Sequence, residues 1–230
     1  LAKRMIDTAY ETAASDIQFL IYLNDDDPML DEYQDTIDKK HYTIGPNRST
    51  CYSWNLMAEE AKYDYVFLAG DDIQFKTKHW DKIMTDGFND YPDKILMAIP
   101  YDGKEKNKPK KILQKKEPTL IGDIPFSSPH FLVHKNWINT VGYFLPPQFW
   151  HWHIDNWLTK IAVKLDRAYV LPNVQIKSKK LTNDHTGNRI RKEMNIIKRD
   201  LDVWNRTKGR YMDADVKALQ DFIGRNNGNT

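Results

Sequence analysis

Two spacings of apolar residues alternate along this chain. Short apolar, β-branched and aromatic runs predict strands at residues 17–23, 42–44, 65–69, 95–99, 131–134 and 169–171. Between them, apolar residues recur every three or four positions, which predicts helices at residues 2–13, 50–62, about 80–84 and about 157–165. Thr77 is the expected N-cap of the third helix. This alternation predicts an α/β fold built on a mixed, mostly parallel sheet.

The residues after 188 show a helical pattern and no strand pattern. A narrow apolar stripe with basic residues between its members begins near Ile190 and ends at Trp204, and a last short helix carries Val216 and Leu219. No shift in composition marks a second folding unit. We therefore expect a single domain over residues 1–188 and a helical appendage over residues 189–230.

Composition removes several classes of protein. The 230 residues hold 34 Lys and Arg against 32 Asp and Glu, so the chain is neither polycationic nor polyanionic as a whole. A single cysteine, Cys51, excludes an internal disulfide framework and a multi-cysteine zinc module. The sequence has no apolar run of membrane-spanning length and no signal-peptide pattern, so we expect no membrane span and a cytoplasmic location, in the host cell if the protein is viral.

Acidic residues follow two of the expected strands. Gly70-Asp71-Asp72 comes directly after strand 65–69, and Asn24-Asp25-Asp26-Asp27 comes after strand 17–23. Ligands of open α/β sheets bind at the carboxyl edge, where such loops meet. Carboxylates there suit a divalent cation that bridges them to phosphate oxygens. Taken singly, each loop is also consistent with a simple turn.

Other short motifs extend this pattern. Upstream they are Ile44-Gly45-Pro46 and Trp54-Asn55; downstream they are Gly142-Tyr143-Phe144, Asp155-Asn156-Trp157-Leu158, Tyr169-Val170-Leu171-Pro172 and His185. In order and spacing, the set resembles the GT-A-fold (Rossmann-like) glycosyltransferases of the broad family 2 type, over about residues 1–187. It is most similar to the short glycosyltransferase-like proteins of phages and large DNA viruses. The first strand of that family, with the loop after it, has no counterpart in this sequence.

The resemblance implies a role for each matching residue. Asp72 matches a metal ligand and Asp71 a contact to the ribose or to a metal-bound water. Asp25 and Asp27 match the loop that meets the base or ribose, and Asp155 matches the catalytic base that deprotonates the acceptor. The family commonly has Glu-Asp where this chain has Ile154-Asp155.

The implied reaction moves a sugar from a nucleotide-sugar donor, UDP-sugar by default, to a hydroxyl acceptor, with Mn²⁺ or Mg²⁺ as cofactor. His185 matches a further metal ligand. It lies in a basic stretch from Lys177 to Arg199, of which Arg189 is the candidate contact to the donor diphosphate.

Trp150-His151-Trp152-His153 is an unusual string. Its aromatic rings suit stacking on a sugar or a base, and packing under a loop explains them equally well. A zinc site formed by His151, His153 and Asp155 is a weaker alternative. If this segment is extended, Trp152 should be exposed.

Basic residues leave other functions open. Seven lysines between Lys104 and Lys116, together with the stretch after Lys177, could follow a nucleic-acid backbone. The acceptor could accordingly be a hydroxymethylated DNA base or a viral glycan. The alternatives are a nucleic-acid-binding module on the same fold, and a metal-dependent hydrolase or nucleotidyltransferase that uses the same carboxylates.

Overall fold

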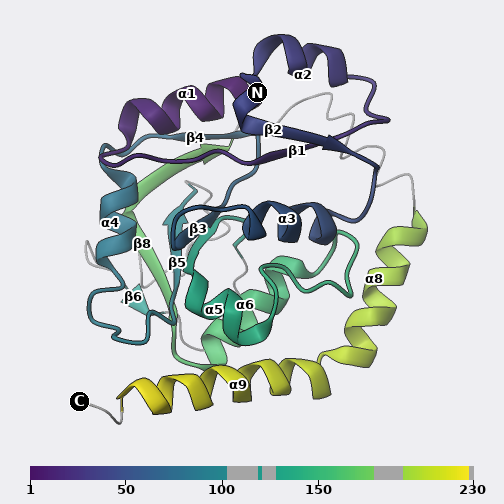
Figure 1. Ribbon diagram of the computed structural model, residues 1–230. Helices are drawn as coiled ribbons and strands as arrows, with labels where there is room; N and C mark the ends of the chain where they lie inside the picture. The colour runs from purple at the N-terminus through teal and green to yellow at the C-terminus, as the bar shows by residue number, and fades with distance from the viewer. Residues whose placement is uncertain (103–118, 121–127, 179–193, 228–230) are drawn as a thin grey trace.

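The computed structural model describes residues 1–102, 119–120, 128–178 and 194–227. Within these residues the larger of two sheets has six strands (Figure 1). Five of them lie in the order β3 (Tyr65–Leu68), β7 (Phe131–His134), β5 (Met97–Tyr101), β8 (Ala168–Ser178) and β4 (Ile73–Phe75). The sixth, β6 (Thr119–Leu120), also pairs with β8.

This sheet is mixed and mostly antiparallel, so the prediction of a mostly parallel sheet is wrong. Among the described strands of this sheet, only β5 and β8 pair in parallel. β7 is antiparallel to both β3 and β5, and β8 is antiparallel to β4 and β6. Apolar runs indicate that a strand is buried but not its direction. The direction depends on pairing between distant segments, such as Leu68 with Phe131.

A second, two-stranded sheet pairs β1 (Ile21–Asn24) with β2 (Tyr42–Gly45) in parallel. Helix α2 (Leu30–Thr36) and a short 3₁₀ turn, η1 (Lys39–His41), connect these strands. Helix α3 (Thr50–Glu59) follows β2, and its N-cap Ser49 accepts a hydrogen bond from the Tyr52 amide. The carboxyl ends of β1 and β2 therefore open toward the start of α3.

The expected strands and helices are present, with shifted ends. Helix α1 (Ala2–Thr12) buries Met5 and Ala9 at the predicted spacing of four. Helix α4 (Trp80–Asp86) begins after His79 rather than at a Thr77 cap. The Thr77 hydroxyl instead donates to the Asn173 carbonyl at 3.1 Å and accepts from the Gln175 amide at 2.9 Å, which ties it to β8. The pattern missed α2, α5 (Lys135–Val141), β4 and β6.

Alternate residues of the central strands enter two different cores. Met97 and Ile99 of β5 face a cluster shared with α3, α5 and α6 (Ile154–Lys164). Leu96 and Ala98 face a cluster shared with α1 and α4. This period of two is that of a strand covered on both faces. Figure 1 shows α4 and the pair α5 and α6 on different sides of the sheet.

The C-terminal residues form two helices, α8 (Met194–Thr207) and α9 (Arg210–Asn227). At 18 residues, α9 is longer than the short helix predicted, and its Leu219 is fully buried in the core that contains Trp157. Asp215 of α9 accepts hydrogen bonds from the Tyr143 hydroxyl and from the Trp157 indole N–H. Burial raises the pKa of Asp215. The proposed domain boundary after residue 188 lies outside the described residues.

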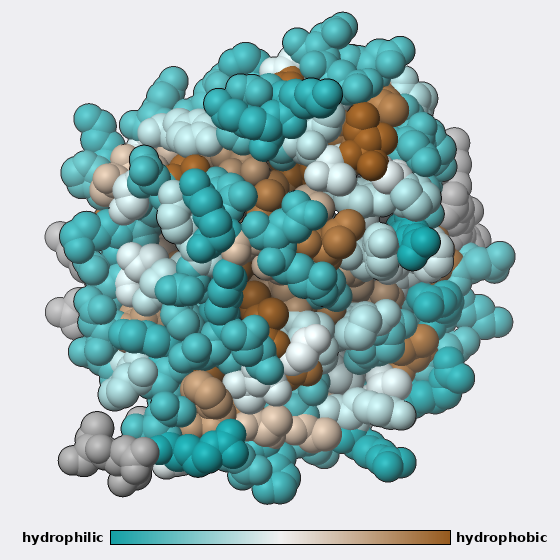
Figure 2. Space-filling model, in the orientation of Figure 1, coloured by the Kyte–Doolittle hydropathy of each residue, from teal (hydrophilic) through white to brown (hydrophobic). Residues whose placement is uncertain are grey.

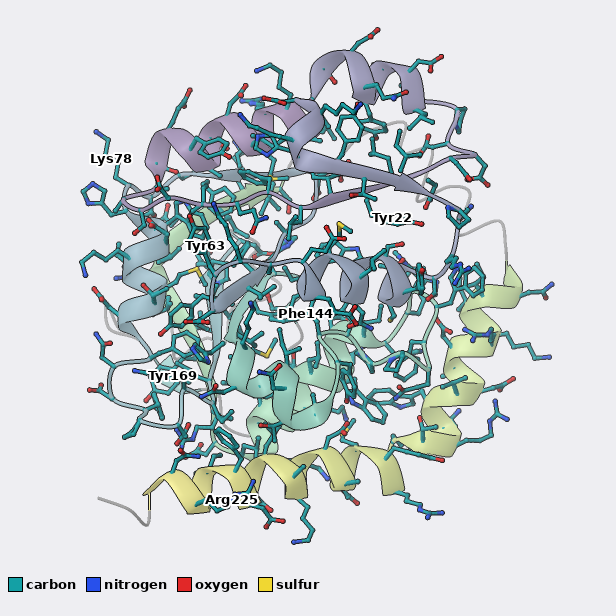
Figure 3. The ribbon with its side chains drawn as sticks, in the orientation of Figure 1. Tyr22, Tyr63, Lys78, Phe144, Tyr169 and Arg225 are labelled. Atoms are coloured by element: carbon teal, nitrogen blue, oxygen red, sulfur yellow. The ribbon has the colours of Figure 1, made fainter. Side chains whose placement is uncertain are left out.

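Asn55 of α3 fixes the loop that follows α5. Its side-chain oxygen accepts the backbone amides of Phe144 and Leu145, each at 2.8 Å, and its amide donates to the Leu145 carbonyl at 2.7 Å. Figure 3 shows Phe144 next to α3. Asn55, one of the motif residues named above, thus stabilises the conformation of this loop. None of the helices described is long and apolar enough to cross a membrane.

Candidate functional site

A cleft of about 1770 Å³ runs from the carboxyl ends of β1, β2 and β3 along the space between β1 and β3. Its apolar part is lined by side chains of β1, β3 and α3, including Ile21, Phe67 and Met57. Figure 2 shows apolar atoms between hydrophilic side chains in the middle of this face. The polar end is formed by the loops that follow the three strands, which is where α/β folds bind ligands.

Both predicted acidic loops reach this cleft. Asp27 from the loop after β1 lines it, as do Asp71 and Asp72 from the loop after β3. Asp25 is exposed and does not line the cleft, and its amide donates to the Gly45 carbonyl at 2.8 Å. The roles assigned to these residues from the sequence stay predictions.

The loop after β1 has internal hydrogen bonds of its own. The Asp27 carboxylate accepts the Met29 amide at 2.9 Å, the geometry of an Asx turn. The Asp26 carboxylate accepts from the Asn47 side-chain amide at 2.9 Å, which joins this loop to the one after β2. Asp27 thus forms the turn that its position after a strand suggests, and Asp26 and Asp27 both line the cleft.

The end of β3 is crowded. A Cβ on Gly70 would lie 2.9 Å from Oδ1 of Asp72 and 3.2 Å from Cε1 of His130. His130 is buried beside β7, and the Gly70 amide donates to its Nδ1 at 3.4 Å. His130 was not identified from the sequence. The one feature of the sequence that points to His130 is its position as a polar residue immediately before the apolar run 131–134.

A basic and aromatic group faces the cleft near β2. The Arg48 guanidinium lies 4.5 Å from the centre of the Tyr52 ring, and the Tyr22 hydroxyl donates to the Pro46 carbonyl at 2.9 Å. Figure 3 shows Tyr22 extending from β1 toward α3. Burial, Tyr52 and Asp25 raise the pKa of Tyr22, and the Arg48 charge opposes them. Arg48 was also missed, although it is a basic residue directly ahead of a helix.

The Trp150–His153 string is not extended. His153 has a left-handed backbone, with φ of 66°, and is the N-cap residue of α6. Trp150 and His151 line the cleft, with Trp150 36% exposed. Trp152 is half-buried and its indole nitrogen is enclosed. Trp152 was expected to be exposed only if this segment were extended, and it is not.

The two histidines of this string have different surroundings. The His153 ring stacks on Trp204 at 5.3 Å, while His151 Nδ1 shares a 2.8 Å hydrogen bond with the Thr50 hydroxyl. Burial lowers the pKa of His151, and the charges of Asp200 and Asp155 oppose that effect. This arrangement does not support the zinc alternative.

Asp155 lies in the first turn of α6, where its carboxylate accepts the Asn156 amide at 2.9 Å. It is not among the residues that line the cleft, although its neighbour His151 is. His185 and Arg189 lie outside the described residues, as do Lys104–Lys116 and most of the second basic stretch.

The carboxylates fit one kind of metal site. No group of three or more His, Cys, Asp or Glu side chains within residues 1–102, 119–120, 128–178 and 194–227 is arranged to hold a metal. Mg²⁺-type sites commonly use one or two protein carboxylates and complete their coordination with water and substrate phosphates. Asp71 and Asp72, adjacent carboxylates that both line the cleft, match the protein part of a site of that kind.

Comparison with known proteins gives a result at the level of fold. No family model matches the chain, and no curated protein matches its sequence. The mannosyltransferase PcManGT of Pyrobaculum calidifontis, solved with GDP-Man and Mn²⁺, matches with a TM-score of 0.60 at 12% identity. The match covers 96% of this chain and 65% of PcManGT. The fold is similar to that of GT-A glycosyltransferases.

Two further structures agree. S. aureus TarS (residues 1–349), solved with UDP-GlcNAc, matches with a TM-score of 0.58 at 11% identity, over 81% of this chain and 56% of that one. GalNAc-T7, solved with UDP, GalNAc and Mn²⁺, matches at 0.50 and 11% identity, over 72% of this chain and 38% of that one. The chain thus spans less than two thirds of each of these neighbours, all of which are nucleotide-sugar glycosyltransferases.

Proposed function

We propose that this protein is a metal-dependent glycosyltransferase that moves a sugar from a nucleotide donor to a hydroxyl group. The observation that carries the proposal is the meeting of two acidic loops, through Asp27 and through Asp71 and Asp72, on one cleft of a GT-A-like fold. UDP-sugar is the proposed donor, Mn²⁺ or Mg²⁺ the cofactor, and a glycan or a hydroxymethylated DNA base of viral origin the acceptor.

The acidic loops suit a nucleotide diphosphate only together with a cation, since carboxylates alone repel phosphate. Asp72 would hold the ion, with Asp71 and His185 beside it. An ion held there would neutralise the negative charge that develops on the leaving diphosphate. Arg189 is the proposed contact from the protein to the same diphosphate.

The nucleoside would lie toward β1 and β2. Asp25 and Asp27 are the proposed contacts to base or ribose. The loop of Asn47 and Arg48, joined to Asp26 by a 2.9 Å hydrogen bond, forms the adjacent wall. The Arg48 guanidinium, which lies 4.5 Å from the centre of the Tyr52 ring, would bring a positive charge to this side of the cleft.

The acceptor would enter beside the loop before α6. Asp155 is the proposed general base for its hydroxyl, a role worth about 10²- to 10⁴-fold in rate. His151 lines the cleft, and the charge of Asp155 acts on its pKa against the larger effect of burial.

An assay of donor turnover tests the proposal. The chain would be incubated with UDP-glucose, UDP-N-acetylglucosamine and GDP-mannose, in Mn²⁺ and in EDTA, and the nucleotide products measured. We expect one donor to release nucleoside diphosphate with Mn²⁺ only, and Asp72→Asn to abolish that release. Asp86→Asn, which removes an exposed carboxylate paired with Lys82 on α4, is the matched control and should behave as the unmodified chain. Release of pyrophosphate, or turnover that persists in EDTA, would favour a nucleotidyltransferase or a metal-independent activity instead.

A further inference from the structure

A buried carboxylate from the C-terminal part of the chain organises one wall of the cleft. Asp200 of α8 has no exposed surface. Its oxygens accept the backbone N–H of Trp150 at 2.9 and 3.1 Å, of His151 at 2.8 Å and of Trp152 at 2.8 Å. Three consecutive amides thus converge on one anion, the arrangement of a backbone nest.

The charge of Asp200 is balanced from its own helix. The Arg199 guanidinium donates to Oδ1 of Asp200 at 2.9 Å. The same guanidinium lies 5.6 Å from the centre of the Trp150 ring. Burying a carboxylate without partners costs folding free energy. Here three backbone amides and the Arg199 guanidinium donate to the Asp200 carboxylate and offset that cost.

The opposite side of the loop is fixed by α3. The Thr50 amide donates to the Trp150 carbonyl at 2.8 Å, and the Thr50 hydroxyl is 2.8 Å from Nδ1 of His151. Residues 150–152 are therefore held between α3 and α8, and Figure 1 shows the loop before α6 between these two helices.

This loop presents two side chains of particular chemistry to the cleft. Trp150 offers an indole face, and His151 offers a ring whose Nδ1 is already engaged. An aromatic face packs against the C–H face of a sugar ring, and an imidazole nitrogen bonds to hydroxyl groups. The loop is separate from those after β1, β2 and β3, which form the proposed nucleotide side.

We infer that Asp200 is a positioning residue that fixes Trp150 and His151 as the acceptor wall of the cleft. The inference rests on the proposed function for its acceptor role. The hydrogen bonds to Asp200 place the loop, and the loop places the two side chains. Helix α8 then supports the site through Asp200, which contacts the loop and not the acceptor.

Hydrogen exchange tests the positioning step without any substrate. In Asp200→Asn, one of the two accepting oxygens becomes a donor, so the amides of residues 150–152 lose their anion. We expect their protection to fall by about tenfold or more, with little change in β5 and β7. Asp202→Asn, an exposed carboxylate two residues along the same helix, is the matched control. Unchanged protection at residues 150–152 in Asp200→Asn overturns the inference.

A second measurement tests the acceptor role. The stabilisation of the chain by UDP or GDP with Mn²⁺ reports the nucleotide side, and turnover of the donor reports the completed site. We expect Asp200→Asn to keep the nucleotide-induced shift in melting temperature and to lose about 10- to 100-fold in turnover. Equal loss of both would show a structural role only, and overturn the inference.

Thr50→Val provides an independent variant if Asp200→Asn does not fold. It removes the hydroxyl that meets His151 and leaves the Ser49 cap of α3 in place. We expect Thr50→Val to keep the nucleotide-induced shift in melting temperature and to lose turnover, by a smaller factor than Asp200→Asn. If the unmodified chain binds no nucleotide at all, the proposed function fails, while the hydrogen-exchange result still decides whether Asp200 holds the loop.

Discussion

Oδ1 of Asp72 occupies the space that a side chain at Gly70 would need. A side chain at position 70 would begin 2.9 Å from Oδ1 of Asp72 and 3.2 Å from the His130 ring, closer than a Cβ is normally found to either atom. Glycine at position 70 therefore leaves room for the Asp72 carboxylate beside the end of β3. A larger residue at position 70 would have to displace the carboxylate on which the proposed metal site depends.

The first prediction concerns Gly70. Gly70→Ala should displace the Asp72 carboxylate and weaken Mn²⁺-dependent nucleotide binding by about tenfold or more, because the ligand geometry of a shared metal site is restrictive. Titration calorimetry with UDP or GDP and Mn²⁺ measures the change. Gly224→Ala is the control: its Cβ would meet nothing within 4 Å inside α9. That variant should bind normally and gain about 0.5–1 kcal/mol of stability.

The second prediction concerns pH. Burial, assisted by Lys94 and Lys135, lowers the pKa of His134, whose Nδ1 accepts the Asn136 amide as the N-cap of α5. A lowered folded-state pKa contributes stability above the ordinary histidine value, and that stability is lost as pH falls through the folded value. Urea unfolding at pH 7.5, 6 and 5 should therefore show declining stability.

His134→Asn isolates this contribution. Asparagine caps a helix N-terminus but does not titrate in this range, so the decline with pH should be shallower in the variant. It should not vanish, because burial also lowers the pKa values of His41 and His151. Identical slopes for the variant and the unmodified chain would show that His134 does not contribute.

The third prediction concerns Asn55. Asn55→Ala removes the acceptor of two backbone amides and the donor to the Leu145 carbonyl, so it should destabilise the fold by about 1–3 kcal/mol. Asn226→Ala on α9 removes an exposed side chain that donates to the Phe222 carbonyl, and should cost no more than about 0.5 kcal/mol. Equal effects in chemical denaturation would show that the loop after α5 is held by other contacts.

The fourth prediction concerns Cys51. Its side chain is fully buried, and burial raises the pKa of the thiol to about 12. The thiolate is the reactive form, so iodoacetamide at pH 8 should leave the folded chain unmodified and alkylate it fully in denaturant. Rapid modification of the folded chain would mean that α3 opens readily from the core.

The sequence predicted well those features that depend on local pattern. The apolar runs located most of the strands, and the spacing of Met5 and Ala9 located the buried face of α1. The acidic loops were predicted to share one edge of one sheet; β1 and β3 belong to different sheets, yet Asp27, Asp71 and Asp72 line one cleft. These results follow because burial and turns are expressed in neighbouring residues.

Features that depend on distant pairing could not be predicted in this way. Strand direction is one, since it requires knowing that β3 pairs with β7. Asp200 is another: beside Arg199 in α8 it looks like a solvated charge, yet it is buried against Trp150, fifty positions earlier. Thr77 likewise resembled a helix cap and instead bonds to β8.

The most direct test of the account is calorimetric titration of UDP, GDP, CDP, TDP and ADP into the chain, each with Mn²⁺ and with EDTA. The account predicts saturable binding of one nucleoside diphosphate in Mn²⁺, no binding in EDTA, and loss of the signal in Asp72→Asn. Binding of equal strength in EDTA, or in Asp72→Asn, would contradict the central claim that the carboxylates after β3 hold a cation for the donor diphosphate.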